Sequence, residues 1–135
     1  MENIAIIGAG AWGTALAMVA RRAGRNVVLQ AHEPEVVDAV NEACENSLFL
    51  PGVALDPEIR ATNDPAEAAA DADAVLLAVP AQFLRAVLTG FSGNLPSGAP
   101  VVICAKGIEQ GTLALMSEIC DEVAPETPVA FLSGP

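Results

Sequence analysis

The sequence predicts an α/β fold in which helices cover both faces of a doubly wound, mainly parallel sheet. Short apolar runs of strand length alternate with segments of helical periodicity along the chain. The core must be aliphatic, because 53% of the 135 residues are hydrophobic and only 4% are aromatic, which suits a sheet buried on both faces. A glycine-rich turn joins the first apolar run to the first helical segment. These observations predict one Rossmann-type domain over residues 1–135.

The amino-terminal stretch carries the most specific pattern. Residues 4–7 are apolar and few, so they predict a buried strand. Gly8, Gly10 and Gly13 follow as G-x-G-x-x-G, and an alanine-rich helical segment comes next. Strand, glycine turn and helix in this order are typical of dinucleotide binding.

Each glycine has its own physical role in that motif. Gly8 permits the tight turn, Gly10 lets the backbone approach a pyrophosphate, and Gly13 lets the helix pack closely on the sheet. The helix then begins with Ala11 and Trp12, whose end of the helix offers N–H groups and a partial positive charge to phosphates. A glycine turn without a ligand is the alternative, and the strand and helix around the motif favour a cofactor.

The second unit repeats the strand and helix pattern. Residues 27–31 predict a buried strand, and residues 34–45 predict a helix. His32 and Glu33 lie between them, where a Rossmann domain reads the adenosine ribose. An acid there favours NAD and a cation favours NADP, so the choice between NAD and NADP stays open. Glu33 could instead open the helix that follows.

The next segment, residues 46–52, reads Asn-Ser-Leu-Phe-Leu-Pro-Gly and has an apolar centre that is unusual for a surface loop. It either packs on the core or caps a binding cleft. Residues 60–62 predict a short strand, and residues 65–70 predict a third helix after Asp64.

The second half of the chain begins with a strongly apolar strand at residues 74–79. Pro80 ends it and begins a helix that runs to about Leu88. Ligands of open α/β sheets lie beyond the carboxyl ends of strands, so Val79 and Pro80 are candidate lining of a cleft. Three side chains of that helix are expected to face the core: Phe83, Leu84 and Val87.

Lys106 is the last candidate and the only lysine in the chain. It follows a predicted strand at residues 100–105, on the same sheet edge as the other candidates, which favours a function over a solvated charge. Residues 91–99 predict a loop. An amphipathic helix is expected from Thr112, with Leu113 and Leu115 on its apolar face, and a last strand at residues 128–132.

Composition limits the partners and the compartment. With 17 acidic against 6 basic residues the chain has a net charge of −11, which argues against nucleic acid and anionic membrane surfaces. The three cysteines are widely spaced, so neither a disulfide framework nor a metal site is expected. Because the sequence shows no apolar run of membrane-spanning length and no signal peptide, we expect a cytoplasmic protein.

Several stretches together resemble one family, the NAD(P)-dependent glycerol-3-phosphate dehydrogenases of bacterial type. The resemblance implies reversible reduction of dihydroxyacetone phosphate to sn-glycerol 3-phosphate in phospholipid synthesis. It also implies that Ala11, Trp12 and His32 contact NAD or NADP, that Lys106 approaches cofactor and substrate, and that Gly134 contacts substrate. The stretches are GAGAWGTALA at 8–17, His32, NSLFLPG at 46–52, VPAQ at 79–82, AKGIE at 105–109 and SGP at 133–135.

The family differs from this chain in one respect. Its members carry a second, mainly helical domain that supplies the catalytic lysine, and this chain stops where that region would begin. We therefore expect no catalytic residue in this chain, an electrostatic role for Lys106, and cofactor binding with little or no turnover. Apolar surface that a second domain would cover makes a homodimer possible.

Other functions fit parts of the pattern. A reductase of ketopantoate or pyrroline-5-carboxylate also begins with a Rossmann domain, but the NSLFLPG and AKGIE segments together are not expected there. A non-catalytic NAD(H)-sensing module is the second alternative. A methyltransferase that uses S-adenosylmethionine is disfavoured, because the three-glycine motif matches a pyrophosphate.

Overall fold

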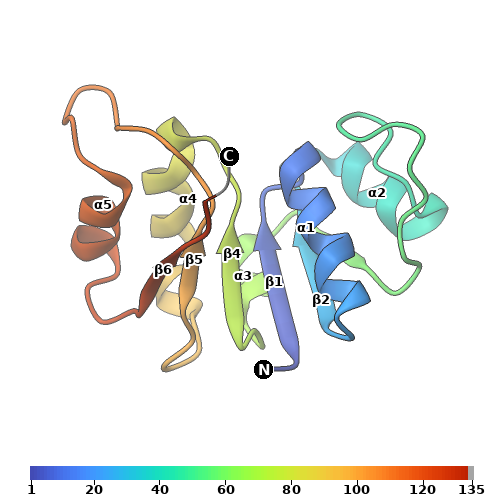
Figure 1. Ribbon diagram of the computed structural model, residues 1–135, viewed down its shortest axis with the longest axis horizontal. Coiled ribbons are helices and arrows are strands. Elements are labelled where there is room, and N and C mark those ends of the chain that lie inside the picture. Colours follow the sequence, from blue (N-terminus) through green and yellow to red (C-terminus); the bar gives the residue numbers. More distant parts are fainter. Residues whose placement is uncertain (134–135) are drawn as a thin grey trace.

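The computed structural model describes residues 1–133 and contains one six-stranded sheet (Figure 1). All five strand pairs are parallel, and their order is β3-β2-β1-β4-β5-β6. The strands are β1 (Asn3–Ile7), β2 (Asn26–Gln30), β3 (Arg60–Thr62), β4 (Ala74–Leu77), β5 (Val101–Ile103) and β6 (Val129–Phe131). The helices are α1 (Ala11–Arg22), α2 (Pro34–Ala43), α3 (Pro65–Ala69), α4 (Leu84–Phe91) and α5 (Met116–Val123), with short 3-10 turns at Ala81–Phe83 and Ser92–Asn94.

The chain winds outward from the middle of the sheet in two directions. β1, α1, β2, α2 and β3 build one half, α3 crosses back, and β4, α4, β5, α5 and β6 build the other. This confirms the predicted doubly wound fold, and the sheet is wholly parallel in residues 1–133. The strand order reverses between β1 and β4, so the cofactor crevice of such a sheet lies beyond the carboxyl ends of these two strands.

Alternate side chains of β1 separate the core into two layers. Ala5 and Ile7 pack with residues of α3, α4 and α5, while Ile4 and Ile6 pack with residues of α1 and α2. Since β1 is buried on both faces, its sequence is continuously apolar instead of alternating. The aliphatic core predicted from composition is therefore confirmed.

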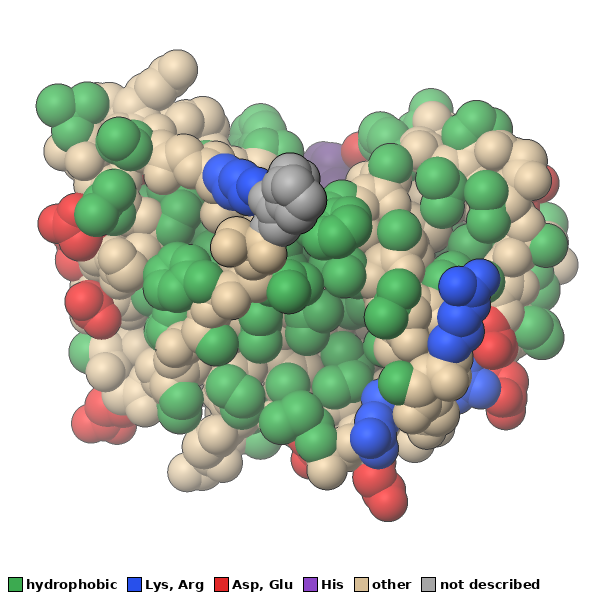
Figure 2. Space-filling view, viewed as in Figure 1, with side chains coloured by type: hydrophobic (Ala, Val, Ile, Leu, Met, Phe, Trp, Pro, Cys, Tyr) green, Lys and Arg blue, Asp and Glu red, His purple; other side chains and the backbone are tan. Residues whose placement is uncertain are grey.

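One face of the sheet is only partly covered by helices over β4, β5 and β6. On the face that carries α1 and α2, those helices pack against β1, β2 and β3. Beyond them, Leu76 and Val102 are only half-buried, and Ala130 and Leu132 are exposed. Figure 2 shows hydrophobic side chains gathered on this face.

The prediction of the helix after β4 is partly wrong. A 3-10 turn at Ala81–Phe83 comes first, and α4 extends to Phe91. Leu84, Leu88 and Phe91 take the core face at i, i+4 and i+7, so Phe83 falls off that face and is 61% exposed, contrary to prediction. Phe91 was expected to open a loop, but it is fully buried.

The last helix begins later than the sequence predicts. The Thr112 hydroxyl donates to the Glu109 carboxylate and accepts from the Ala114 N–H, so it closes a turn instead of capping a helix. Leu113 has φ +61° and is 75% exposed. The helix starts at Met116, and Glu118 accepts from the backbone N–H of Leu115, which is half exposed.

Candidate functional site

The glycine turn leaves no room for side chains at its two ends. Gly8 follows β1 with φ +106°, and a Cβ added there would lie 2.6 Å from the Ala78 carbonyl oxygen. A Cβ added at Gly13 would lie 1.9 Å from the Gly8 carbonyl oxygen. Both glycines are therefore required by the close packing of α1, β1 and the end of β4. The predicted packing role of Gly13 is supported by this geometry.

Gly10 differs, because its surroundings are open. It caps α1 with an ordinary φ of −68°, and a Cβ added there would meet no atom of residues 1–133 within 4 Å apart from its chain neighbours. The first intrahelical bond runs from the Thr14 N–H to the Gly10 carbonyl at 3.0 Å. The preceding N–H groups, those of Ala11, Trp12 and Gly13, therefore belong to the helix end that attracts anions.

This turn fits the pyrophosphate of a dinucleotide. The space beside Gly10 is open to a ligand, and the first turn of α1 contains no acidic residue. The Trp12 side chain is 55% exposed at the same turn. Gly8, Gly10, Ala11, Trp12 and Gly13 thus lie together, as the sequence predicts.

The ribose candidates follow β2, the neighbour of β1. Ala31 donates to the Thr62 carbonyl at 3.0 Å, and His32 comes next as an exposed residue. Glu33 is the N-cap residue of α2, and Pro34 opens the helix. The carboxylate of Glu33 makes no capping hydrogen bond within the described chain, although its position matches the helix-opening alternative. Both residues therefore lie at the predicted edge of the sheet.

The end of β4 forms the other side of the crevice. Ala78 donates to the Ile7 carbonyl at 2.8 Å, which continues the pairing of β4 with β1. The Val79 side chain then lies against the glycine turn, since a Cβ added at Gly8 would be 3.0 Å from its Cγ1. Pro80 follows as an exposed residue. Val79 is thus brought to the site, and Pro80 lies on its rim.

Lys106 follows β5 on a loop that is held against the 3-10 turn at Ala81–Phe83, just before α4. The amide of Gln82 donates to the Ile108 carbonyl at 2.9 Å and accepts from the Gln110 N–H at 2.8 Å. Gly107 has φ +131°, and a Cβ added there would lie 3.3 Å from the Ala81 Cβ. The structure therefore places Lys106 at the same edge as the glycine turn. Figure 2 shows this edge hollowed between the two halves of the molecule.

An ion pair adds a second attachment for the same loop. The Arg85 guanidinium donates from Nε and Nη2 to Glu109 at 2.9–3.1 Å, and from Nη1 to Glu122 at 2.7 Å. Hydrogen bonds from Arg85, and secondarily from Thr112, hold the pKa of Glu109 below its ordinary value of 4.5. Sequence reasoning missed this pair, because its partners lie 24 residues apart.

Protonation of Glu109 at low pH should lower the free energy of unfolding. Its lowered pKa means that the folded state favours the ionised carboxylate, so it stabilises the fold at neutral pH. This stabilisation is lost as pH falls through the lowered pKa. Urea unfolding between about pH 7 and pH 3 should show Glu109→Gln less stable than the natural chain at neutral pH, with the difference vanishing in acid.

Glu122→Gln is the matched control, because Glu122 contacts the same guanidinium with a more exposed side chain. Solvent screening should make its effect smaller. A constant gap between the natural chain and Glu109→Gln across this pH range would contradict the assignment.

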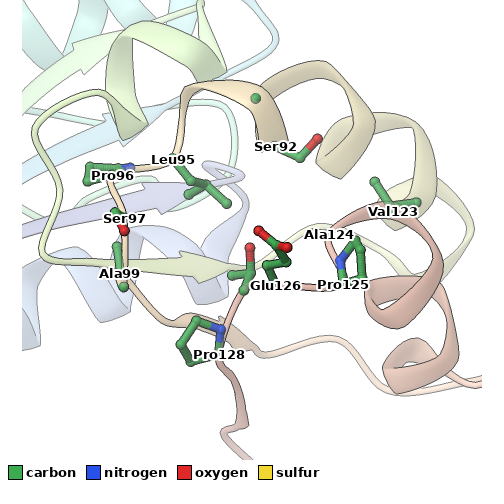
Figure 3. Close-up of a pocket in the computed structure, with 13 residues that line it drawn as sticks. Ser92, Leu95, Pro96, Ser97, Ala99, Val123, Ala124, Pro125, Glu126 and Pro128 are labelled. Carbon is green, nitrogen blue, oxygen red and sulfur yellow. The ribbon is translucent and has the colours of Figure 1, made fainter.

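The remaining features of residues 1–133 add no candidate residue to this site. A pocket at the amino ends of β5 and β6 is formed by loops, and Glu126 is its only ionisable side chain (Figure 3). No group of three metal-ligating side chains lies within the described chain, and none of its helices is long and apolar enough to cross a membrane. Cys104 and Cys120 are buried free thiols, and burial raises the pKa of both. Gly134, a predicted substrate contact, lies outside the described residues.

The fold and the glycine turn define a Rossmann domain of the dinucleotide-binding class. Comparison with known proteins gives the particular family. The family described as NAD-dependent glycerol-3-phosphate dehydrogenase N-terminus matches residues 3–135, so the chain belongs to this family.

Individual relatives agree with this assignment. The chain is 56% identical over 134 residues to a glycerol-3-phosphate dehydrogenase [NAD(P)+] of Caulobacter vibrioides, covering 99% of this chain and 40% of the relative. A protein of the same name from Rhodospirillum rubrum is 58% identical over 135 residues, 100% of this chain and 39% of the relative. The crystal structure of glycerol-3-phosphate dehydrogenase from Coxiella burnetii gives a TM-score of 0.91 at 30% identity, covering 99% and 41%. The chain thus spans about two fifths of the length of these relatives.

Proposed function

We propose that this chain is the dinucleotide-binding domain of an sn-glycerol-3-phosphate dehydrogenase. The family match over residues 3–135 carries the proposal, and the open space beside Gly10 supports it. The proposed reaction interconverts dihydroxyacetone phosphate and sn-glycerol 3-phosphate. NAD(P)H, when bound, supplies a hydride to the carbonyl carbon, and the carbonyl oxygen takes a proton.

The residues of this chain have binding and positioning roles in the proposal. The glycine turn binds the pyrophosphate, and His32 or Glu33 contacts the adenosine ribose. The Lys106 ammonium approaches cofactor and substrate and stabilises negative charge on the substrate oxygens. Gly134 is the proposed second substrate contact. The proton-transferring group is expected to come from a further domain, so we propose no catalytic residue in this chain.

The cellular setting is also a proposal. The product would enter glycerophospholipid synthesis in the cytoplasm, and the net charge of −11 gives no support for a nucleic-acid partner. The less covered face of β4, β5 and β6 supports self-association of the isolated chain as a homodimer.

The coenzyme preference should be weak. Glu33 can accept a hydrogen bond from a ribose 2′-hydroxyl, which favours NADH, while His32 can contact the 2′-phosphate of NADPH. Since the two neighbours have opposite preferences, we expect the dissociation constants for NADH and NADPH to lie within about tenfold of each other. Titration of the chain with each coenzyme measures this ratio. Glu33→Gln should shift it toward NADPH, and an unchanged ratio would remove Glu33 from the ribose site.

A hybrid enzyme tests the proposed function. This chain would replace the segment that it matches in the Rhodospirillum rubrum relative, and NADH oxidation would be followed with dihydroxyacetone phosphate, ketopantoate and pyrroline-5-carboxylate. We expect turnover of dihydroxyacetone phosphate by the hybrid and coenzyme binding without turnover by the isolated chain. Preference for either other substrate would favour the reductase alternatives. A folded hybrid that binds NADH but turns over none of the three substrates would favour the sensing module.

A further inference from the structure

The segment at residues 46–52 reaches the glycine turn through one buried asparagine. Asn46 follows α2 and is fully buried, although the neighbouring side chain of Leu48 is 57% exposed. The Leu50 N–H donates to the Asn46 carbonyl at 2.8 Å, which closes the loop on itself. The function proposed above assigns no role to this residue. Buried side-chain amides are normally hydrogen-bonded, so the partners of Asn46 show what this segment is attached to.

Three hydrogen bonds fix the orientation of the Asn46 amide. Nδ2 donates to the Ala9 carbonyl and to the Thr14 hydroxyl, both at 2.9 Å. Oδ1 accepts from the Phe49 N–H at 3.1 Å. A flipped amide would turn its oxygen toward the Ala9 carbonyl and its NH₂ toward a backbone N–H, so only one orientation is satisfied.

The bond to Ala9 determines where the next backbone N–H points. The Ala9–Gly10 peptide is trans, so the carbonyl of Ala9 and the N–H of Gly10 point in opposite directions. Asn46 holds that carbonyl toward the protein interior. The N–H of Gly10 is thereby turned away from Asn46, at the residue whose added Cβ would meet open space.

We propose that Asn46 is a positioning residue for the pyrophosphate of the cofactor. It keeps a carbonyl oxygen from facing the phosphates and anchors the first turn of α1 through Thr14, the residue whose N–H bonds Gly10. The inference rests on the proposed function, because it requires a dinucleotide on the Gly10 side of the turn. It also assigns a role to the NSLFLPG segment.

Asn46→Ala is the first test, with NADH and adenosine as probes. Loss of the amide should raise the dissociation constant for NADH at least about tenfold, because the Ala9 carbonyl then keeps only the longer, 3.5 Å hydrogen bond from the Thr14 hydroxyl. Adenosine has no phosphate, so its dissociation constant, measured by saturation-transfer NMR, should change less than about twofold.

Asn41→Ala is the matched control. Asn41 also binds backbone through both amide atoms, donating to the Ala61 carbonyl at 3.0 Å and accepting from the Ala61 N–H at 2.8 Å. Both of these hydrogen bonds go to Ala61, so the Asn41 amide fastens α2 to β3. Both variants should lose stability toward urea, but only Asn46→Ala should weaken NADH binding. Equal NADH binding by the two folded variants would overturn the inference.

Asn46→Asp keeps the size of the side chain and serves where the alanine variant does not fold. As a carboxylate it cannot donate to Ala9, but once protonated it can donate again. Its NADH affinity should therefore recover as pH falls from about 8 to about 5, relative to the natural chain at each pH. An affinity that stays at the natural value at all pH values would overturn the inference.

The remaining outcomes distinguish failure of the inference about Asn46 from failure of the proposed function. Weak binding by Asn46→Asp beside normal binding by Asn46→Ala would mean charge repulsion, and would also overturn the inference. Failure of the folded natural chain to bind either coenzyme would refute the proposed function and the inference with it. Binding by the natural chain together with normal binding by both variants would refute the inference alone.

Discussion

Gly13→Ala should unfold the chain or leave it severely destabilised. The new Cβ would lie 1.9 Å from the Gly8 carbonyl oxygen, and no flexible side chain can move to relieve this contact. Either α1 or the end of β1 must shift, at a cost of about 3 kcal/mol or more. Urea unfolding followed by circular dichroism would show the midpoint lowered by about 1 M or more.

Gly90→Ala is the control for this prediction. Gly90 lies within α4, and a Cβ added there would meet no atom of the described residues within 4 Å outside its own helix backbone and chain neighbours. Alanine in a helix is favoured over glycine by about 0.5–1 kcal/mol, so this variant should be slightly more stable than the natural chain. Equal stability of the two variants would contradict the packing role of Gly13.

Gly10→Ala should have the opposite pattern: normal folding with loss of cofactor binding. The backbone at Gly10 has φ −68°, which alanine adopts readily, and within 4 Å the added methyl meets no atom of residues 1–133 apart from its chain neighbours. The methyl would occupy the space of the pyrophosphate and lengthen its hydrogen bonds to the backbone. Loss of about 2 kcal/mol, or about thirtyfold in the dissociation constant for NADH, is expected.

The stability of Gly10→Ala decides how that result is interpreted. Its free energy of unfolding should stay within about 1 kcal/mol of the natural value, since alanine is less favourable than glycine at a helix N-cap by only about that amount. Normal NADH affinity in the folded variant would show that the cofactor does not approach the turn at Gly10. Together, Gly10→Ala and Gly13→Ala would separate the binding and packing roles within one motif.

Local patterns in the sequence were sufficient to predict the sheet. Every strand except β3 (Arg60–Thr62) is built on a short apolar run, and the glycine motif lies between the first strand and the first helix. The edge that carries Gly10, His32, Val79 and Lys106 therefore followed from topology. The predicted start of the last helix was wrong because a tertiary contact redirects a side-chain hydrogen bond. Thr112 has the residue type of an N-cap, but its hydroxyl bonds to Glu109, which Arg85 holds in place.

The support of the site could not be predicted from local patterns. Asn46 lies 37 residues from Ala9, and Gln82 lies 26 residues from Ile108. The sequence indicated only that the segment at 46–52 was unusual, and left open whether it packs on the core or caps a cleft. The structure shows a mixture, because the asparagine is buried behind the glycine turn while Leu48 and Phe49 are exposed.

Energy transfer from Trp12 to NADH tests the central claim most directly. Trp12 is the only tryptophan, the chain has no tyrosine, and its side chain is 55% exposed in the first turn of α1. A cofactor on this turn should quench the tryptophan emission saturably and raise emission from the nicotinamide, and Gly10→Ala should need about thirtyfold more NADH for the same changes. Unchanged Trp12 emission on addition of NADH to the folded chain, or the same titration midpoint in folded Gly10→Ala, would contradict binding at the glycine turn.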